Sequence, residues 1–208
     1  MPITTFAAAG LRRRSGLLLA ALLLAMPAFG SAVAGPLQAP HLSRYQAGKA
    51  PFGFRNVCGQ YPWACSNRAS GKITGDAEIL AIARKINSSV NRKIRQVTDR
   101  AQFGVKERWT LPTSGKGDCE DIVLMKLKML IDAGVAPRRL FMAQVLPRRF
   151  EQHVVLIVRT KKGDYVLDSL TSRVKTWRQT GYTFLKMQNT SNARKWDVVL
   201  LGPMASRN

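Results

Sequence analysis

Residues 115–132 read GKGDCEDIVLMKLKMLID and contain the most strongly apolar helical pattern after the N-terminal region. A glycine-rich loop is followed, from about Asp118 to Asp132, by a predicted helix that Gly134 and Pro137 end. Its apolar residues cover nearly the whole circumference: Ile122, Val123, Leu124, Met125, Leu127, Met129, Leu130 and Ile131. Because a helix that is apolar nearly all round is a buried one, we expect it at the centre of the domain.

The flanking segments predict a second helix and an antiparallel sheet. Between Asp76 and Thr98, apolar residues recur at three- and four-residue steps, and Thr74 or Asp76 can cap this helix. Strands are predicted at 106–111, 140–146, 153–160, 165–170 and 196–201, with a hairpin turn at 161–164. Helices followed by strands indicate an α+β domain with a buried helix packed on an antiparallel sheet.

The N-terminal residues have the three consecutive regions of a secretory signal peptide. Three arginines at 12–14 precede an apolar run from Leu17 to Phe29, and Ala32-Val33-Ala34 is a small-x-small cleavage site. A membrane anchor is the alternative, but the run is shorter than the ~20 residues that a span needs. We therefore divide the chain into a signal peptide (1–34), a proline-containing extended arm (35–52) and one domain (53–208). No later segment is long enough to span a membrane, so we expect no stable membrane insertion after cleavage.

The chain is strongly basic, with a formal net charge of +21. Removing the signal peptide, which holds three arginines and no acid, leaves +18. Such a charge attracts anionic partners, and an export signal favours an envelope polymer, lipid head groups or an acidic protein over nucleic acid. A solubilising surface without a specific partner is the alternative. The positive charges are spread along the chain and form no run typical of a nucleic-acid tail.

Three cysteines, Cys58, Cys65 and Cys119, suggest one disulfide and one free thiol in an exported protein. Cys58 and Cys65 are close in sequence, and we predict that they are bonded to each other. A metal site is the alternative, but the chain has only two histidines, His41 and His153, to assist. Cys119 then remains free.

Cys119 stands where the glycine-rich loop meets the first turn of the buried helix. Unpaired N–H groups and the dipole at a helix N-terminus stabilise negative charge, so we expect a lowered thiol pKa and a nucleophilic thiolate. The flanking acids Asp118, Glu120 and Asp121 oppose this effect, because they would raise the thiol pKa. They either cap the helix or bind a cation, and calcium is the candidate because it prefers oxygen ligands.

A thiolate nucleophile needs a positioned base, and His153 is the only histidine after Cys58. Asp168 interrupts the next predicted strand with a charge and is the candidate to orient the imidazole. A tight turn centred on Lys162-Gly163 would pair Asp168 with Ile157, roughly 13 Å along the strand from His153. Contact between the two side chains therefore requires a shifted turn, a bulge or strong coiling of the strands.

Gly117-Asp118-Cys119-Glu120-Asp121, the helix with Lys126, His153-Val154-Val155-Leu156 and Val166-Leu167-Asp168-Ser169 together resemble the bacterial transglutaminase-like cysteine proteinases. Cys58 and Cys65 resemble an N-terminal feature of that family. The resemblance covers most of residues 50–201. It implies a papain-like fold, a periplasmic location and a catalytic triad of Cys119, His153 and Asp168.

The best understood relatives are calcium-dependent proteases that release a surface adhesin. The resemblance thus implies calcium ligands at Asp118 and Glu120, and less directly at Asp121. Ser169 stands where an asparagine often follows the triad aspartate of that family, and Ile122 stands where the family usually has an aromatic residue. We expect an exported thiol protease that cleaves a protein in the cell envelope. An amine-accepting cross-linking enzyme and a non-catalytic basic envelope-binding module are the alternatives.

Overall fold

Helix α4, Cys119–Asp132, lies at the centre of the structure, as the sequence predicts. Ile122, Val123 and Leu124 on its first turns have no exposed surface. We describe the protein from a computed structural model, in which residues 40–147 and 151–205 are described and belong to one unit, Gln38–Asn208. The predicted signal peptide lies outside these residues. No helix of the described ranges combines the length and the apolar character needed to cross a bilayer.

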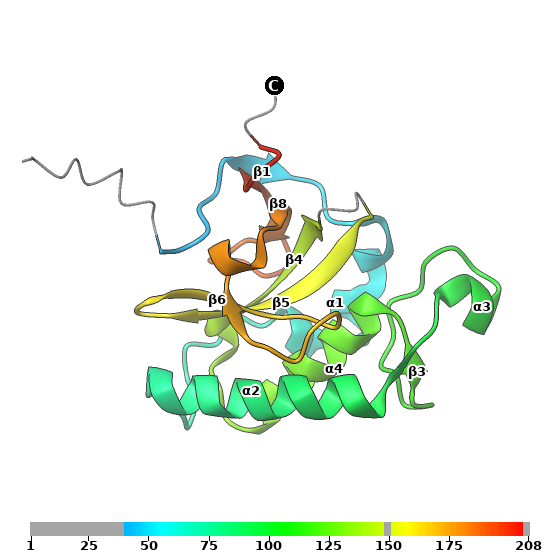
Figure 1. The fold of residues 1–208 in the computed structure, drawn as a ribbon, viewed down its shortest axis with the longest axis horizontal. Helices are drawn as coiled ribbons and strands as arrows, with labels where there is room; N and C mark the ends of the chain where they lie inside the picture. Colours follow the sequence, from blue (N-terminus) through cyan, green and yellow to red (C-terminus); the bar gives the residue numbers. More distant parts are fainter. Residues whose placement is uncertain (1–39, 148–150, 206–208) are drawn as a thin grey trace, which may run out of the picture. The chain divides into compact units, whose positions relative to one another are not determined.

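A seven-stranded antiparallel sheet supports α4, in the order β1-β9-β8-β4-β5-β6-β7. The α+β class predicted from the order of elements is thus confirmed. Figure 1 shows α4 and the long helix α2 on the same side of the strands. The sheet consists of β1 (Gln46–Gly48), β4 (Leu140–Leu146), β5 (His153–Thr160), β6 (Gly163–Leu167), β7 (Lys175–Thr176), β8 (Thr183–Gln188) and β9 (Trp196–Leu201).

The two faces of the sheet belong to two different cores. Even-numbered residues of β5, such as Val154 and Leu156, pack with α2 and α4 in the larger core. Odd-numbered residues, such as Val155 and Ile157, pack in a smaller core on the other face with Trp177. Because side chains alternate along a strand, residue number alone decides which core a side chain of β5 enters.

The remaining elements are short, apart from α2. They are α1 (Val57–Gln60), α2 (Asp76–Lys93), α3 (Asp99–Phe103), the parallel pair β2 (Arg95–Gln96) and β3 (Lys116–Gly117), and four 3₁₀ turns at Phe52–Asn56, Pro62–Cys65, Pro137–Arg139 and Arg178–Thr180. The disulfide joins α1 to the second 3₁₀ turn, Pro62–Cys65. Cys58 and Cys65 are bonded, with their Cα atoms 5.5 Å apart, and Cys119 is free.

Three sequence predictions about elements need correction. Helix α2 ends at Lys93 rather than Thr98, because the backbone of Arg95 and Val97 turns to bond Gly115 and Gly117. Neither predicted cap is used: Gly75 is the N-cap, and Asp76 forms an ion pair with Arg139.

Residues 106–111 form no strand. The backbone N–H of Thr110 donates to Asp121 and that of Leu111 to the hydroxyl of Tyr61, so side chains replace a neighbouring strand. The third correction concerns the strand predicted at 165–170, which is β6 and ends at Leu167, so Asp168 follows the strand instead of interrupting it.

The arm before the domain contributes to the sheet. Strand β1 pairs with β9, and the N–H of Tyr45 donates to the carbonyl of Val198. At the opposite side, the N–H of Leu42 donates to the buried carboxylate of Asp164 at 2.8 Å. Residues 40–48 therefore contact both β9 and the hairpin of β5 and β6.

Candidate active site

Cys119 begins helix α4, and its side chain is partly exposed. The thiol lies 3.1 Å from a carboxylate oxygen of Glu120 and accepts a hydrogen bond from the backbone N–H of Val154. That second contact places the sulfur against the first residues of β5, next to His153. The close approach of loop and helix depends on Gly117, where a Cβ would lie 2.7 Å from the Cβ of Asp121.

His153 and Asp168 are in direct contact, with 2.7 Å between Nε2 of the imidazole and Oδ1 of the carboxylate. Both side chains are buried. The contact arises from the hairpin register, in which Thr160 pairs with Gly163 and Leu156 with Leu167. The turn is therefore Lys161-Lys162, and the register continued past the strand sets Asp168 beside Val155. The expected pairing of Asp168 with Ile157 is therefore wrong by two residues. The shifted turn brings Asp168 close to His153 without a bulge in the hairpin.

The protonation state of this pair follows from its surroundings. Burial raises the pKa of Asp168, but hydrogen bonds from His153, Leu170 and Tyr182 outweigh it and hold the pKa below its usual range. An ionised Asp168 accepts from Nε2–H of His153. The other ring nitrogen, Nδ1, is then the unprotonated one, available to a thiol.

Tyr182 also belongs to this arrangement, and the sequence analysis missed it. Its hydroxyl donates to Oδ2 of Asp168 at 2.7 Å, and its ring meets the His153 ring edge to face. Tyr182 lies just before β8, a strand that we did not predict, so nothing in the sequence pattern linked it to the hairpin.

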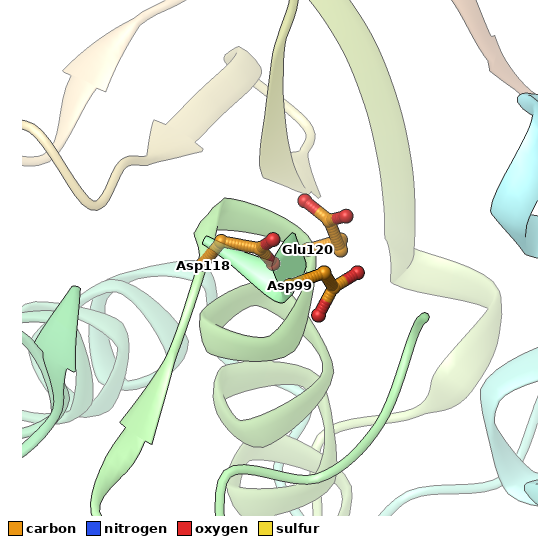
Figure 2. Close-up of side chains that lie close together, drawn as sticks. All are labelled: Asp99, Asp118 and Glu120. Atoms are coloured by element: carbon orange, nitrogen blue, oxygen red, sulfur yellow. The ribbon is translucent and has the colours of Figure 1, made fainter. Parts of the chain in front are cut away.

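Three carboxylates, of Asp99, Asp118 and Glu120, converge at the first turn of α4 (Figure 2). One oxygen from each lies within 4.8 Å of the others. Asp118 is the N-cap residue, yet its side chain makes no capping hydrogen bond, and its Oδ1 is buried without a partner among the described residues. Capping, one of our two explanations for these acids, therefore does not apply to Asp118.

Asp121 is placed differently from the other two predicted ligands. One of its oxygens accepts from the N–H of Thr110 at 2.7 Å, and the side chain is fully buried. It is not part of the cluster of three. Burial raises the pKa of Asp121 to about 8, and its other oxygen, Oδ2, is buried without a hydrogen-bond partner among the described residues.

The neighbouring acids also change the pKa of the Cys119 thiol. Burial and the neighbouring charge of Glu120 raise the pKa of Cys119, opposite to the lowering that we expected from the helix dipole. The dipole contributes roughly 0.3–1 kcal/mol, and a carboxylate 3.1 Å away outweighs it. Burial likewise raises the pKa of Asp118 and of Glu120, each further raised by a neighbouring acid. A divalent cation among these oxygens would oppose all three shifts.

Asp99 is the ligand candidate that the sequence analysis missed. Thr98 caps helix α3 through the N–H of Ala101, and this fixes Asp99 in the first turn. A usable signal existed in the composition, because five of the 12 acids of this basic chain lie between residues 99 and 121. Glu107, also in this stretch, contacts Glu120 and accepts from the indole of Trp109.

A thiol at a helix N-terminus, set against a strand that presents histidine to a carboxylate, defines the class of thiol hydrolases with a transglutaminase-like fold. The profile described as bacterial transglutaminase-like cysteine proteinase (BTLCP) matches residues 44–202. The chain belongs to this family and is a cysteine protease of the transglutaminase-like type, which confirms the resemblance seen in the sequence.

Solved structures of LapG from Legionella pneumophila share the fold. The calcium-bound structure is 21% identical with a TM-score of 0.51, and the match covers 62% of this chain and 73% of that one. A second LapG structure is 22% identical with a TM-score of 0.50, covering 62% and 72%. Comparison with curated proteins gives no match.

Proposed function

We propose that this chain is an exported thiol protease that cleaves a protein of the cell envelope, with Cys119, His153 and Asp168 as its catalytic residues. The contact between His153 and Asp168 carries the proposal, because it leaves Nδ1 of His153 free at the strand end that Cys119 touches. The sequence order of a signal peptide supports export, and export of this kind leads to the periplasm in bacteria with two membranes.

In the proposed reaction, Nδ1 of His153 takes the thiol proton as the sulfur of Cys119 attacks the substrate carbonyl carbon. His153 then gives this proton to the leaving amine, and the carbon–nitrogen bond breaks. Asp168 stabilises the imidazolium in between. Water hydrolyses the thioester, which returns the thiol. The N–H groups of the first turn of α4, which have no partner within the helix, are the candidate donors to the oxyanion.

We further propose that Asp99, Asp118 and Glu120 hold a calcium ion. The residues fit such an ion, because they supply three carboxylates in close proximity and one of them has a buried, unpartnered oxygen. Calcium in LapG supports the proposal. When bound, the ion supplies positive charge that offsets the acids around Cys119. The high positive charge of the whole chain acts against cation binding at long range, so the three ligands must provide the affinity locally.

Proteolysis is tested by incubating the mature protein with an envelope extract and identifying new protein termini by mass spectrometry. Cys119→Ala and His153→Ala should each lower the rate about 10³-fold or more while the fold remains. His41→Ala is the matched control, because His41 is the only other histidine and bonds Thr160 at the far end of β5. Near wild-type cleavage by either triad variant would refute the assignment. Incorporation of a labelled amine in place of new termini would instead identify a cross-linking enzyme.

A further inference from the structure

Tyr182 contacts both members of the histidine–aspartate pair. Its hydroxyl is 2.7 Å from Oδ2 of Asp168, and its ring centroid is 6.4 Å from that of His153 with the planes at 87°. The proposed mechanism uses neither contact. Tyr182 is nevertheless the residue that joins the two side chains from outside the β5–β6 hairpin.

The hydrogen bonds of Asp168 are divided unequally between its two oxygens. Oδ1 accepts from His153 and from the backbone N–H of Leu170. Oδ2 accepts from Tyr182 alone among the residues that the structure describes. Rotation about the Cβ–Cγ bond of Asp168 would exchange its two oxygens. The hydrogen bond from Tyr182 to Oδ2 opposes this rotation, and so keeps Oδ1 facing His153.

The tyrosine is itself well anchored. It follows Gly181, which has a positive φ of 69°, and its N–H donates to the hydroxyl of Thr180 at 3.1 Å. Its side chain packs against the smaller core. Burial and the charge of Asp168 raise the pKa of Tyr182, so the hydroxyl keeps its proton and remains a donor throughout the physiological range.

We propose that Tyr182 is a positioning residue of the protease: by holding Oδ2 of Asp168, it keeps Oδ1 on Nε2–H of His153 and so keeps Nδ1 unprotonated and facing the nucleophile. The inference rests on the triad proposed above. It assigns to Tyr182 no contact with substrate. Its effect is on the orientation of the base and on the stability of the imidazolium formed during the reaction.

Tyr182→Phe tests the proposal because it removes only the hydroxyl. We expect kcat to fall about 10-fold or more with KM within about twofold, since the hydroxyl acts after substrate is bound. Tyr165→Phe is the matched control, because Tyr165 lies on β6 and its hydroxyl makes no hydrogen bond within the described residues. In an Asp168→Ala background, Tyr182→Phe should have little further effect, because the hydroxyl acts through the carboxylate. An equal loss in both backgrounds would show a merely structural role and overturn the proposal.

A second measurement does not depend on protease activity. The chain has only two histidines, so ¹⁵N NMR of the histidine side chains resolves His153 with His41 as internal reference. Wild-type His153 should be protonated at Nε2 in its neutral form, and Tyr182→Phe should raise the share of the Nδ1–H form while His41 stays unchanged. An unaltered His153 tautomer in the variant overturns the inference. Absence of Cys119-dependent cleavage in the wild type would instead overturn the proposed function, and the tautomer would still report on Tyr182.

Discussion

Lys126 is the most unusual single residue of the core. It lies on α4 with no exposed surface, and its ammonium nitrogen has no hydrogen-bond partner among the described residues. Burial lowers the pKa of Lys126 to about 7, although the charge of Asp168 acts in the opposite direction. A buried lysine without a hydrogen-bond partner weakens the fold, because the charge of Asp168 offsets only part of the solvation that its charged form loses.

The first prediction concerns stability. Lys126 has a pKa of about 7 when folded and a reference value of 10.5. Between these pH values the unfolded chain binds more protons, so this residue makes stability rise with pH from about 7 to 10.5 and leaves it lowest below 7. Lys126→Met should therefore stabilise the protein by several kcal/mol at pH 6, on the scale of about 1.4 kcal/mol per pKa unit.

The gain should shrink as the pH approaches 10, and urea unfolding at pH 6, 8 and 10 measures it. Lys128→Met is the matched control, since Lys128 lies on the same helix but is exposed and paired with Asp132. A gain that does not depend on pH would contradict the prediction, because it would mean that Lys126 keeps its charge in the folded state over the same pH range as in the unfolded chain.

At the residue scale, the sequence predicted Cys119, His153 and Asp168 as nucleophile, base and orienting acid, because a lone free thiol and a lone late histidine leave few choices. The structure places His153 and Asp168 in contact and leaves Cys119 free, and their catalytic roles stay a prediction. It did not identify Tyr182 or the burial of Lys126. Tyr182 contacts Asp168 from the segment before β8, and no sequence pattern links that segment to the hairpin. A lysine in an apolar helix is normally expected to extend its charge to solvent.

At the element scale, the proposed calcium site depends on two helices. Asp99 comes from α3, and Asp118 and Glu120 come from the start of α4. Between the helices lies the loop that brings Thr110 to Asp121. A cation held by both helices would fix this loop relative to the nucleophile.

Calcium should therefore raise the melting temperature of the wild type, and a chelator should reverse the change. Asp99→Asn should weaken calcium affinity at least about tenfold, because it removes one of three charged ligands. Calorimetric titration measures the affinity without reference to activity. Asp132→Asn is the control, since Asp132 is an exposed acid at the other end of α4. An unchanged affinity in Asp99→Asn would exclude Asp99 from the ligands.

Helices and strands were predicted best where the apolar pattern extends over many residues. Helix α4 and strands β4 and β5 have the predicted ranges, whereas β7 and β8 were missed and 106–111 was assigned wrongly. The missed strands are short or carry polar residues such as Lys186 and Gln188. Gln188 is fully buried and bonds the backbone of Met142 and Ala64, so tertiary contacts determine its place and local pattern does not.

At the scale of the whole molecule, charge is distributed unevenly. Acids that are paired, such as Asp76, Asp164 and Asp197, fix loops and the arm to the sheet. Five of the 12 acids lie between residues 99 and 121, in the stretch that leads to the first turn of α4. Basic residues are dispersed, which agrees with the absence of a basic run in the sequence and leaves an anionic envelope partner as a prediction.

The N-terminal arm before Lys49 should contribute to the stability of the fold but not to the catalytic rate. It buries Leu42, adds β1 to the sheet and satisfies Asp164, which has no exposed surface. A chain that starts at Lys49 should be less stable than one that starts at Gly35 by on the order of 4 kcal/mol. Its kcat at low temperature should be unchanged, because among the described residues the arm makes no hydrogen bond or ion pair with Cys119, His153, Asp168 or the hydroxyl of Tyr182, although His41 and Ser43 line a pocket together with Tyr182.

Thermal melts and kinetics of the two chains check this expectation. Tyr45→Ala in the longer chain serves as a control, since that arm residue is largely exposed. Equal melting temperatures would show that the arm contributes nothing to the fold. A loss of kcat without a loss of stability would place the arm in the active site after all.

The two-residue turn at Lys161-Lys162 constrains how this protein can vary. His153 and Asp168 are 15 positions apart. They can meet only because the hairpin register places Asp168 beside Val155, on the same face of the sheet as His153. If the turn keeps two residues, one inserted residue would shift the register by one and send the carboxylate to the helix side. Two inserted residues would lengthen the hairpin by one pair and keep the register. Active natural variants should therefore preserve the parity of the histidine-to-aspartate interval, so a homologous gene in which this interval differs by one residue is marked as having lost the pair.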